Sequence, residues 1–311
     1  MKIAIIGAGA MGSLFASHLA STDAEIWAFD VWREHVEAIR RDGLIVHRDG
    51  AQRSVRVNAT SVAAEAGVCD VAMVFVKFRQ TAGAIGAARP MIGADTTIVT
   101  LQNGIGNVEI IAQAYPANPI AFGLTTLTCE LLGPGHIEAS YKGAGETYLW
   151  PRNGTENPLL GPLCALMVRG GINAAREPGI ALKIWKKLVV NCCLNTMCAI
   201  TGQNVGAVAD TPEAWRFLDG VADEIAAAAS LEGIALPAAE ARSFLRSVAA
   251  EARNHEPSML IDVRNRRRTE IDCLNGAILK VCEKHGVAAP FNSALYAMIR
   301  VLESRFPGAA A

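Results

Sequence analysis

The chain has 311 residues, of which 51% are hydrophobic, and this is enough to bury two cores of about 130 to 180 residues each. Its 29 basic and 30 acidic residues are spread along the whole length and give a formal net charge of −1, so the basic patch of a nucleic-acid-binding protein is absent. No apolar run reaches the ~18 residues of a membrane-spanning helix, and residues 1–7 form a strand pattern instead of a signal peptide. We therefore expect a soluble, cytoplasmic, two-domain protein without nucleic-acid or membrane partners.

The first half of the chain alternates short β-rich runs with helical patterns, which is typical of parallel strands joined by crossover helices. A helix is predicted at 11–20, and strands are predicted at 2–6, 25–29, 71–76 and 97–101. Short turns with glycine and proline join three further strands, at 120–128, 135–140 and 146–150. We expect these three strands to finish the same sheet in antiparallel fashion.

Helical patterns without strands begin near residue 180. We predict helices at 182–200, 212–232, 238–254, 270–285 and 293–304. The boundary is expected at Arg176-Glu177-Pro178-Gly179, where a helix breaker follows a charged pair. The predicted domains are therefore residues 1–177, with α/β structure, and residues 178–311, which are all-α.

A glycine-rich turn joins the first predicted strand to the first helix. It reads Gly7-Ala8-Gly9-Ala10-Met11-Gly12, which is a G-x-G-x-x-G motif in the context of a dinucleotide-binding fold. In such a motif the first glycine allows the tight turn, the second lets the backbone approach a pyrophosphate, and the third lets the helix pack close to the strand. The motif predicts a dinucleotide site formed by Gly7, Gly9, Ala10, Met11 and Gly12, at the N-terminus of a helix.

The residue at the end of the second strand faces the adenosine ribose in this type of fold, and here it is Asp30. A carboxylate accepts hydrogen bonds from ribose hydroxyls and repels a 2′-phosphate, so Asp30 favours NAD over NADP. Arg33 leaves the alternative open, because its guanidinium could hold a phosphate. Asp30 is also a candidate N-cap for a helix that starts near Trp32.

Two further loops are expected near the cofactor, because ligands of open α/β sheets collect at the carboxyl ends of the strands. Lys77 follows one such strand, and Gln102-Asn103-Gly104-Ile105-Gly106 follows the next. The amide of this second loop could donate a hydrogen bond to the nicotinamide or the substrate. A solvated lysine and a plain turn asparagine are the alternatives at Lys77 and Asn103.

A polar stripe interrupts the apolar helix predicted at 182–200. Lys187, Asn191 and Asn195 recur every four residues, so they lie on one helix face. Polar groups on a buried helix cost free energy unless they meet a partner or a ligand. The stripe therefore predicts a cleft lining, and a buried polar network between helices is the alternative.

A second polar cluster flanks the basic run Arg264, Arg266, Arg267 and Arg268. It consists of Pro257-Ser258-Met259-Leu260 and Thr269-Glu270-Ile271-Asp272. Reduction of a ketone needs a proton donor at the carbonyl oxygen and an anchor for a carboxylate. Lys187, Ser258 and Glu270 supply suitable groups. The eight cysteines form no C-x-x-C pair and have no histidine at metal-ligand spacing, so we expect reduced cysteines and no metal site.

The chain resembles the ketopantoate reductases from Gly7 to about Pro290. The resemblance is carried by the 101–106 loop, by Lys187-x3-Asn191-x3-Asn195, and by Pro257-Ser258-Met259-Leu260-Ile261-Asp262 leading to Thr269-Glu270-Ile271-Asp272-x2-Asn275-Gly276. It implies an N-terminal Rossmann-type dinucleotide-binding domain and an all-α C-terminal domain similar to that of 6-phosphogluconate dehydrogenase. It also implies NAD(P)H-dependent reduction of 2-dehydropantoate to pantoate, on the route to pantothenate and coenzyme A. Independently of the resemblance, the helical domain has enough apolar surface to form a homodimer.

The resemblance also implies roles for single residues. Lys187 would be the general acid, and Glu270 would hydrogen-bond the substrate and help fix the charge of the lysine. The other implied contacts are Asn191, Asn195 and Ser258 on the substrate, and Asn103 and Lys77 between cofactor and substrate. Family members typically use NADP and carry a basic residue where Asp30 stands here. The alternatives are therefore a related NAD-dependent 2-keto acid reductase, a hydroxyacid dehydrogenase outside that pathway, and a non-catalytic NAD(H)-sensing protein.

Overall fold

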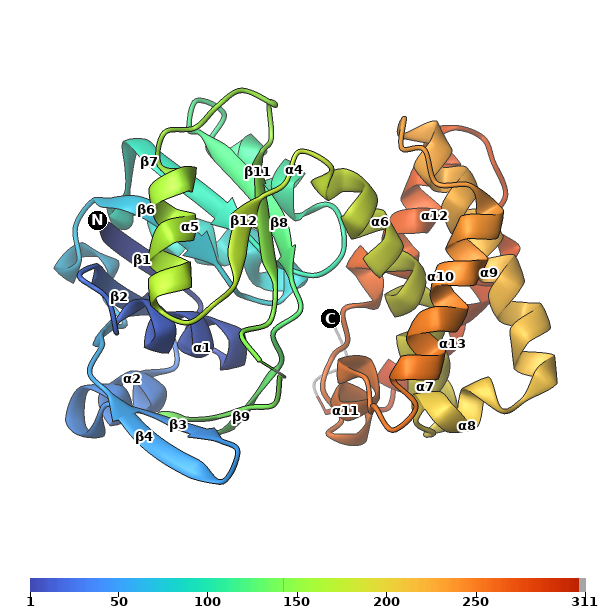
Figure 1. Ribbon diagram of the computed structural model, residues 1–311, viewed down its shortest axis with the longest axis horizontal. Helices are drawn as coiled ribbons and strands as arrows, with labels where there is room; N and C mark the ends of the chain where they lie inside the picture. The colour runs from blue at the N-terminus through green and yellow to red at the C-terminus, as the bar shows by residue number, and fades with distance from the viewer. Residues whose placement is uncertain (142, 308–311) are drawn as a thin grey trace. The chain divides into compact units, whose positions relative to one another are not determined.

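The computed structural model describes residues 1–141 and 143–307, and the chain forms two compact units. The first unit contains Met1–Gln102 and Asn107–Ile180, and the second contains Asn103–Gly106 and the chain from Ala181 onward (Figure 1). The units therefore separate after Ile180, whereas the sequence predicted a boundary after residue 177. The segment Asn103–Gly106 packs with the second unit although it lies in the first half of the chain.

The main sheet of the first unit has eight strands in the order β12-β11-β8-β7-β6-β1-β2-β5. Its strands are β1 (Lys2–Ile6), β2 (Glu25–Phe29), β5 (Asn58–Thr60), β6 (Cys69–Val74), β7 (Ile92–Thr100), β8 (Ile120–Thr125), β11 (Thr147–Pro151) and β12 (Ala174–Arg176). The six adjacent strands from β8 to β5 in this order are parallel to one another. Of the expected antiparallel end, the sheet has one pair, β11 with β8, and β12 is again parallel to β11. The chain order reverses between β1 and β6, and open α/β sheets generally bind ligands at the carboxyl ends of the strands at such a point.

Helices cover both faces of this sheet. They are α1 (Ala10–Leu19), α2 (Arg33–Asp42), α3 (Thr81–Ala87), α4 (Asn107–Ala114) and α5 (Leu160–Arg169), with the 3₁₀ turns η1 (Ala63–Glu65), η2 (Phe78–Gln80) and η3 (Arg89–Met91). Alternate residues of β1 point to two separate cores: Ile3 and Ile5 pack with the side that includes α1 and α5, and Ile6 packs with the side that includes α3 and α4. A strand buried on both faces needs the continuous apolar run seen at its sequence.

A second, four-stranded sheet has the order β4-β3-β10-β9. Its strands are β3 (Leu44–Arg48), β4 (Ala51–Val55), β9 (Cys129–Gly133) and β10 (His136–Ala139). The prediction that residues 135–140 belong to the main sheet was wrong, because β10 pairs in parallel with β3, with His136 opposite Ile45. This pairing joins segments far apart in the sequence, so no local sequence pattern predicts it.

The second unit is helical in its described residues. It contains α6 (Ile180–Val190), η4 (Asn191–Asn195), α7 (Thr196–Thr201), α8 (Val205–Ala209), α9 (Pro212–Leu231), α10 (Ala238–Glu251), α11 (Ser258–Arg264), η5 (Ile271–Cys273), α12 (Asn275–Lys284) and α13 (Pro290–Glu303). The predicted fold class, a Rossmann-type domain followed by an all-α domain, is confirmed.

Two predicted helices of this unit differ from the structure. The single helix expected at 182–200 is interrupted by η4, which is a π-helical segment between α6 and α7. The helix expected from residue 270 begins only at Asn275, because η5 and the non-helical backbone of Leu274 precede it. Glu270 therefore lies on irregular backbone before η5.

The structure also bears on membrane insertion and on the state of the cysteines. Within residues 1–141 and 143–307, no helix combines the length and the apolar character that crossing a bilayer requires. The eight cysteines are unpaired, and all are buried except Cys129, which is half-buried.

Candidate functional site

The glycine loop joins β1 to α1 (Figure 1), and its conformation is the one that the three glycines predict. Gly7 has a φ of +88°, and a Cβ there would lie 2.5 Å from Cγ1 of Val76. At Gly12 a Cβ would lie 1.9 Å from the carbonyl oxygen of Gly7, so only glycine lets α1 approach the loop. A Cβ at Gly9 would meet no protein atom within 4 Å, which leaves its backbone accessible to a ligand.

The N-terminus of α1 lies next to the glycine loop and contributes its first amides. Gly9 is the N-cap residue and no side-chain oxygen caps the helix, whose first residues Ala10 and Met11 are half-buried. The first amides of a helix have no intrahelical partner, and together with the helix dipole they favour an anion. The five predicted residues of the loop therefore lie together in an arrangement that fits a pyrophosphate.

Two buried side chains, those of Ser13 and His35, hold the glycine loop in place by hydrogen bonds. The hydroxyl of Ser13 donates to the carbonyl oxygen of Ala8 at 2.6 Å, and Nε2 of His35 lies 3.3 Å from the same hydroxyl. Nδ1 of His35 accepts a hydrogen bond from the amide of Gly135 at 3.0 Å. Burial lowers the pKa of His35, so the ring is neutral with its proton on Nε2 and donates to Ser13.

Asp30 lies directly after β2 and is half-buried. One carboxylate oxygen accepts from the amide of Ala8 at 2.8 Å, and the other accepts from the amide of Trp32 at 2.9 Å. The expectation that Asp30 caps the following helix was wrong, because α2 begins at Arg33 and its N-cap position is Trp32. Asp30 instead connects the glycine loop to the end of β2, and each oxygen keeps a lone pair for a further donor.

The two loops after β6 and β7 differ in accessibility. Lys77 is exposed and immediately precedes η2. The amide of Gln102 is used inside the first unit: its nitrogen donates to the carbonyl oxygen of Val76 at 2.6 Å and to the Thr81 hydroxyl at 2.9 Å. Gln102 therefore fixes the loop instead of offering its nitrogen to a ligand.

Asn103 and Glu270 come together in the second unit. Nδ2 of Asn103 donates to the Glu270 carboxylate at 3.4 Å, and the amide of Ile105 donates to the carbonyl oxygen of Cys273 at 3.1 Å. At Gly104, where φ is +79°, a Cβ would lie 2.2 Å from that carbonyl oxygen. The close approach of two backbones thus requires the glycine and brings Asn103 beside Glu270.

Lys187 lies on α6, near the C-terminal end of the helix, and is half-buried. Burial lowers the pKa of its amine from 10.5 to about 8, and the negative charge of Glu270 opposes this shift. A lysine with a pKa near neutrality and a carboxylate beside it is a typical acid–base pair. Asn103, Glu270 and Lys187 thus form one cluster of polar side chains, which is called the Lys187 group below.

Asn191 and Asn195 both lie in η4, the segment that follows α6. Nδ2 of Asn195 donates to Oδ1 of Asn191 at 3.1 Å. Asn191 is buried and Asn195 is half-buried. A π-helical turn is rare and is frequent at functional sites; the sequence analysis missed it because the four-residue spacing also fits an α-helix.

Ser258 belongs to the second unit. It is the exposed first residue of α11, which packs against α7 and η4.

The segment before Glu270 is held by the buried carboxylate of Glu303, which accepts from both the amide and the hydroxyl of Thr269 at 2.7 Å. Arg300 pairs with Glu303 at 3.0 Å, so this carboxylate is compensated.

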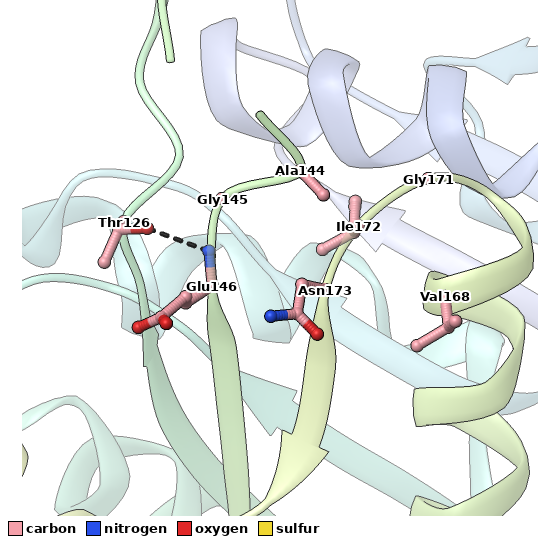
Figure 2. A pocket seen from close by; sticks show the side chains of 8 residues that line it. All are labelled: Thr126, Ala144, Gly145, Glu146, Val168, Gly171, Ile172 and Asn173. Carbon is pink, nitrogen blue, oxygen red and sulfur yellow. Dashed lines mark hydrogen bonds between the residues drawn. The ribbon is translucent and has the colours of Figure 1, made fainter. Parts of the chain in front are cut away.

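A groove of about 540 Å³ lies at the end of β8 and the beginnings of β11 and β12. Figure 2 shows its lining, which consists of Thr126, Ala144, Gly145, Glu146, Val168, Gly171, Ile172 and Asn173. The hydroxyl of Thr126 accepts from the amide of Glu146 at 2.9 Å, and the side chains of Glu146 and Asn173 are exposed. None of these residues belongs to the predicted site. Among the described residues there is also no group of three metal-binding side chains.

Comparison with known proteins identifies the family of the chain. The profile described as "Ketopantoate reductase PanE/ApbA" matches residues 3–154, and the one described as "Ketopantoate reductase PanE/ApbA C terminal" matches residues 179–303. A 2-dehydropantoate 2-reductase from Lactococcus lactis is 31% identical over 296 residues, which cover 94% of each chain.

Two solved structures extend this similarity to the fold. One is the ternary structure of D-mandelate dehydrogenase with NADH and anilino(oxo)acetate, with a TM-score of 0.91, 32% identity and 98% coverage of both chains. The other is a PanE/ApbA family ketopantoate reductase from Ralstonia eutropha JMP134, with a TM-score of 0.89, 27% identity, and coverage of 98% of this chain and 99% of the other. The chain therefore belongs to the ketopantoate reductase family of NAD(P)-dependent oxidoreductases.

Proposed function

We propose that this protein reduces a 2-keto acid to the 2-hydroxy acid with NADH, and that 2-dehydropantoate is the acid. The observation that carries the proposal is the Lys187 group, in which burial lowers the pKa of a lysine to about 8 beside a carboxylate. Such a lysine is still protonated near neutral pH and gives up its proton readily, which is the property that a general acid needs.

The chemistry divides between the cofactor and the chain. A nicotinamide dinucleotide held by the glycine loop would supply a hydride for the keto carbon. Lys187 donates the proton from Nζ to the carbonyl oxygen as negative charge develops there. Glu270 stabilises the charged form of the lysine, and the hydrogen bond from Asn103 holds the carboxylate of Glu270 in place. In this proposal Lys187 is therefore the only proton donor to the carbonyl oxygen of the substrate.

The remaining predicted residues bind the two ligands in this proposal. Asn191, Asn195 and Ser258 hold the hydroxyl and carboxylate groups of the substrate through neutral hydrogen bonds. Gly7, Gly9, Ala10, Met11 and Gly12 bind the pyrophosphate, Asp30 binds the adenosine ribose, and Lys77 and Asn103 contact the cofactor near the substrate. A homodimer in the cytoplasm is also part of the proposal.

A second candidate substrate is an aromatic 2-keto acid. It is favoured by the similarity to D-mandelate dehydrogenase, whose structure was determined with NADH and anilino(oxo)acetate. The product of mandelate dehydrogenation is phenylglyoxylate, a 2-keto acid with the same reacting groups as 2-dehydropantoate. The two candidates therefore use the same Lys187 group and differ only in the side chain that the protein accepts.

The test is the initial rate of NADH and NADPH oxidation with 2-dehydropantoate, phenylglyoxylate and pyruvate. We expect a kcat/KM for 2-dehydropantoate with NADH at least about tenfold above the values for the other two acids, a difference of about 1.4 kcal/mol in transition-state binding. A preference for phenylglyoxylate would transfer the assignment to an aromatic acid. Absence of oxidation with every acid would reject the proposal.

The pH profile should report the protonation state of Lys187. We expect kcat/KM for reduction to be constant below pH about 8 and to fall above it, because the neutral amine has no proton to donate. In Glu270→Gln the carboxylate that raises this pKa is lost, so the falling limb should move to lower pH. Initial rates between pH 6 and 10 measure both profiles. Coincident limbs in the wild type and Glu270→Gln would contradict the pairing.

Asp30 should set the nucleotide preference. Asp30→Asn keeps the shape of the side chain and removes the charge that repels a 2′-phosphate, so the ratio of kcat/KM for NADPH to that for NADH should rise about tenfold or more. Asp70→Asn is a matched control, since the Asp70 carboxylate also accepts a backbone amide, that of Lys2 at 2.7 Å, but at the amino end of β6. An unchanged ratio in Asp30→Asn would remove the basis for preferring NADH.

A further inference from the structure

The helix that carries Lys187 continues through an unusual turn. The segment η4 (Asn191–Asn195) is π-helical, whereas α6 before it and α7 after it are α-helical. A π turn bonds each amide to the carbonyl five residues back, so it contains one residue more than an α turn. The extra residue changes the directions in which Asn191 and Asn195 project relative to Lys187. Because a regular α-helix is the more common conformation, the π turn needs further interactions to stabilise it.

Asn275, the first residue of α12, contacts this turn directly. Its Nδ2 donates to the carbonyl oxygen of Cys192 at 3.2 Å and to Oδ1 of Asn292 at 3.0 Å. Its Oδ1 accepts from the hydroxyl of Thr196 at 2.9 Å. Asn275, Asn292 and Thr196 are completely buried, so every polar atom of the Asn275 side chain is used by a protein partner.

Thr196 closes the contact from the other end of the turn. Its hydroxyl lies 3.4 Å from the carbonyl oxygen of Asn191 and 2.9 Å from Asn275. A hydroxyl has one hydrogen, so its donation goes to the shorter contact, which fixes the amide of Asn275 in the orientation that faces Cys192. Asn275 therefore bonds the carbonyl of Cys192 within η4, and Thr196 fixes the amide orientation that makes this bond.

The chain of buried hydrogen bonds continues to a charged group outside the turn. Nδ2 of Asn292 donates to the Glu224 carboxylate at 2.8 Å, and the amides of Phe291 and Asn292 donate to the same carboxylate, each at 2.8 Å. Glu224 thereby caps the start of α13 and holds Asn292 in place. The network runs from α9 through α13 and α12 to η4, so it connects the π turn to three rigid helices.

We propose that Asn275 and Thr196 are positioning residues, which hold η4 in its π conformation and thereby place Asn191 and Asn195 for the carboxylate and hydroxyl groups of the keto acid. This inference rests on the proposed function, because it assigns Asn191 and Asn195 to the substrate. It separates substrate placement from proton transfer: neither residue contacts the Lys187 group in the hydrogen bonds described above.

The test compares steady-state constants of Asn275→Ala and Thr196→Val with those of the wild type. We expect KM for the keto acid to rise about tenfold or more in both variants, because a small misplacement of binding groups is costly. The dissociation constant of NADH and the pH at which kcat/KM falls should not change, since the glycine loop and the Lys187 group are untouched. Thr196→Ser keeps the hydroxyl and should restore the KM of the wild type.

A matched control separates positioning from stability. In Asn204→Ala the N-cap of α8 is lost, since Oδ1 of Asn204 accepts from the amide of Ala207 at 2.9 Å, and the variant should lower Tm without changing KM. If Asn275→Ala and Thr196→Val lower Tm in the same way and leave the keto-acid KM unchanged, the two residues are only structural and the inference is overturned.

Hydrogen exchange gives a readout that does not depend on turnover. The amides of residues 191–196 should exchange faster in Asn275→Ala than in the wild type, and Asn204→Ala should leave them unchanged. If the wild type reduces no keto acid, the proposed function fails, and this exchange alone decides whether Asn275 holds the turn. Equal exchange in Asn275→Ala and the wild type overturns the inference whatever the activity.

Discussion

Lys187→Met should lower kcat for keto-acid reduction by about 10² or more while NADH still binds. The expected loss is that of a general acid, because methionine fills the space of the lysine stem and has no proton to donate. The dissociation constant of NADH, measured by fluorescence titration, should stay within about twofold of the wild type, since α6 lies outside the glycine loop. A kcat within about threefold of the wild type would remove Lys187 from the chemistry.

The same variant should be more stable than the wild type. Burial lowers the pKa of Lys187 to about 8 from 10.5, so the charged amine costs about 3 kcal/mol of folding free energy. The cost is present below pH about 8, where the folded and unfolded states are both protonated, and it shrinks as the pH rises toward 10.5. Methionine removes this cost but leaves Glu270 without the ammonium, so we expect a gain of about 1 to 3 kcal/mol at pH 7 by urea denaturation. Lower stability in Lys187→Met would show that the ammonium makes a net favourable contribution.

Gly9→Ala should abolish tight binding of NADH without destabilising the protein. A Cβ at Gly9 meets no protein atom within 4 Å, so the folded chain accommodates it. The same methyl group occupies the space through which the backbone approaches the pyrophosphate, and we expect the NADH dissociation constant to rise about 100-fold or more. The variant thus separates cofactor binding from folding.

Two further glycine variants calibrate this result. Gly161→Ala, on α5, also meets no atom within 4 Å and should leave both Tm and the NADH dissociation constant unchanged. In Gly12→Ala the added Cβ meets the carbonyl oxygen of Gly7 at 1.9 Å, so this variant should lose stability as well as affinity. Wild-type affinity in Gly9→Ala would mean that the cofactor does not approach the loop at this point.

The parts of the structure that local patterns specify were predicted well from the sequence. The predicted strands at 2–6 and 25–29 match β1 and β2, and the predicted helix at 11–20 differs from α1 by one residue at each end. These elements follow from a continuous apolar run, a glycine motif and a helical apolar period, which are all contained in about 30 residues. The glycine geometry followed as well, because the spacing of the three glycines already encodes the turn.

The parts that depend on distant partners could not be predicted in this way. The pairing of β10 with β3 joins residues about 90 positions apart, and no turn signal connects them. The same holds for Asn103, whose neighbours Glu270 and Cys273 come from the helical unit. Local sequence predicts only that Asn103 lies in a glycine-rich loop, whereas its hydrogen-bond partner is set by tertiary packing.

The π turn is the most instructive difference within the candidate site. The spacing of Lys187, Asn191 and Asn195 fits a regular α-helix, so the sequence predicted one polar face. In the structure the turn is held by Asn275, a residue about 80 positions later. Asn275 belongs to the motif that relates the chain to its family, but no role followed from the motif alone. The alternative interpretation of the polar stripe, a buried polar network between helices, has support because η4 adjoins such a network, whereas the cleft lining stays a prediction.

The most direct test of the account is a single-turnover experiment in which the protein, loaded with one equivalent of NADH, is mixed with excess 2-keto acid and followed at the NADH absorbance. The account predicts complete oxidation of the bound NADH in one exponential phase with the wild type and a phase about 10² or more slower with Lys187→Met. Bound NADH that no 2-keto acid oxidises would contradict the account and would instead indicate a protein that binds the dinucleotide without turning it over.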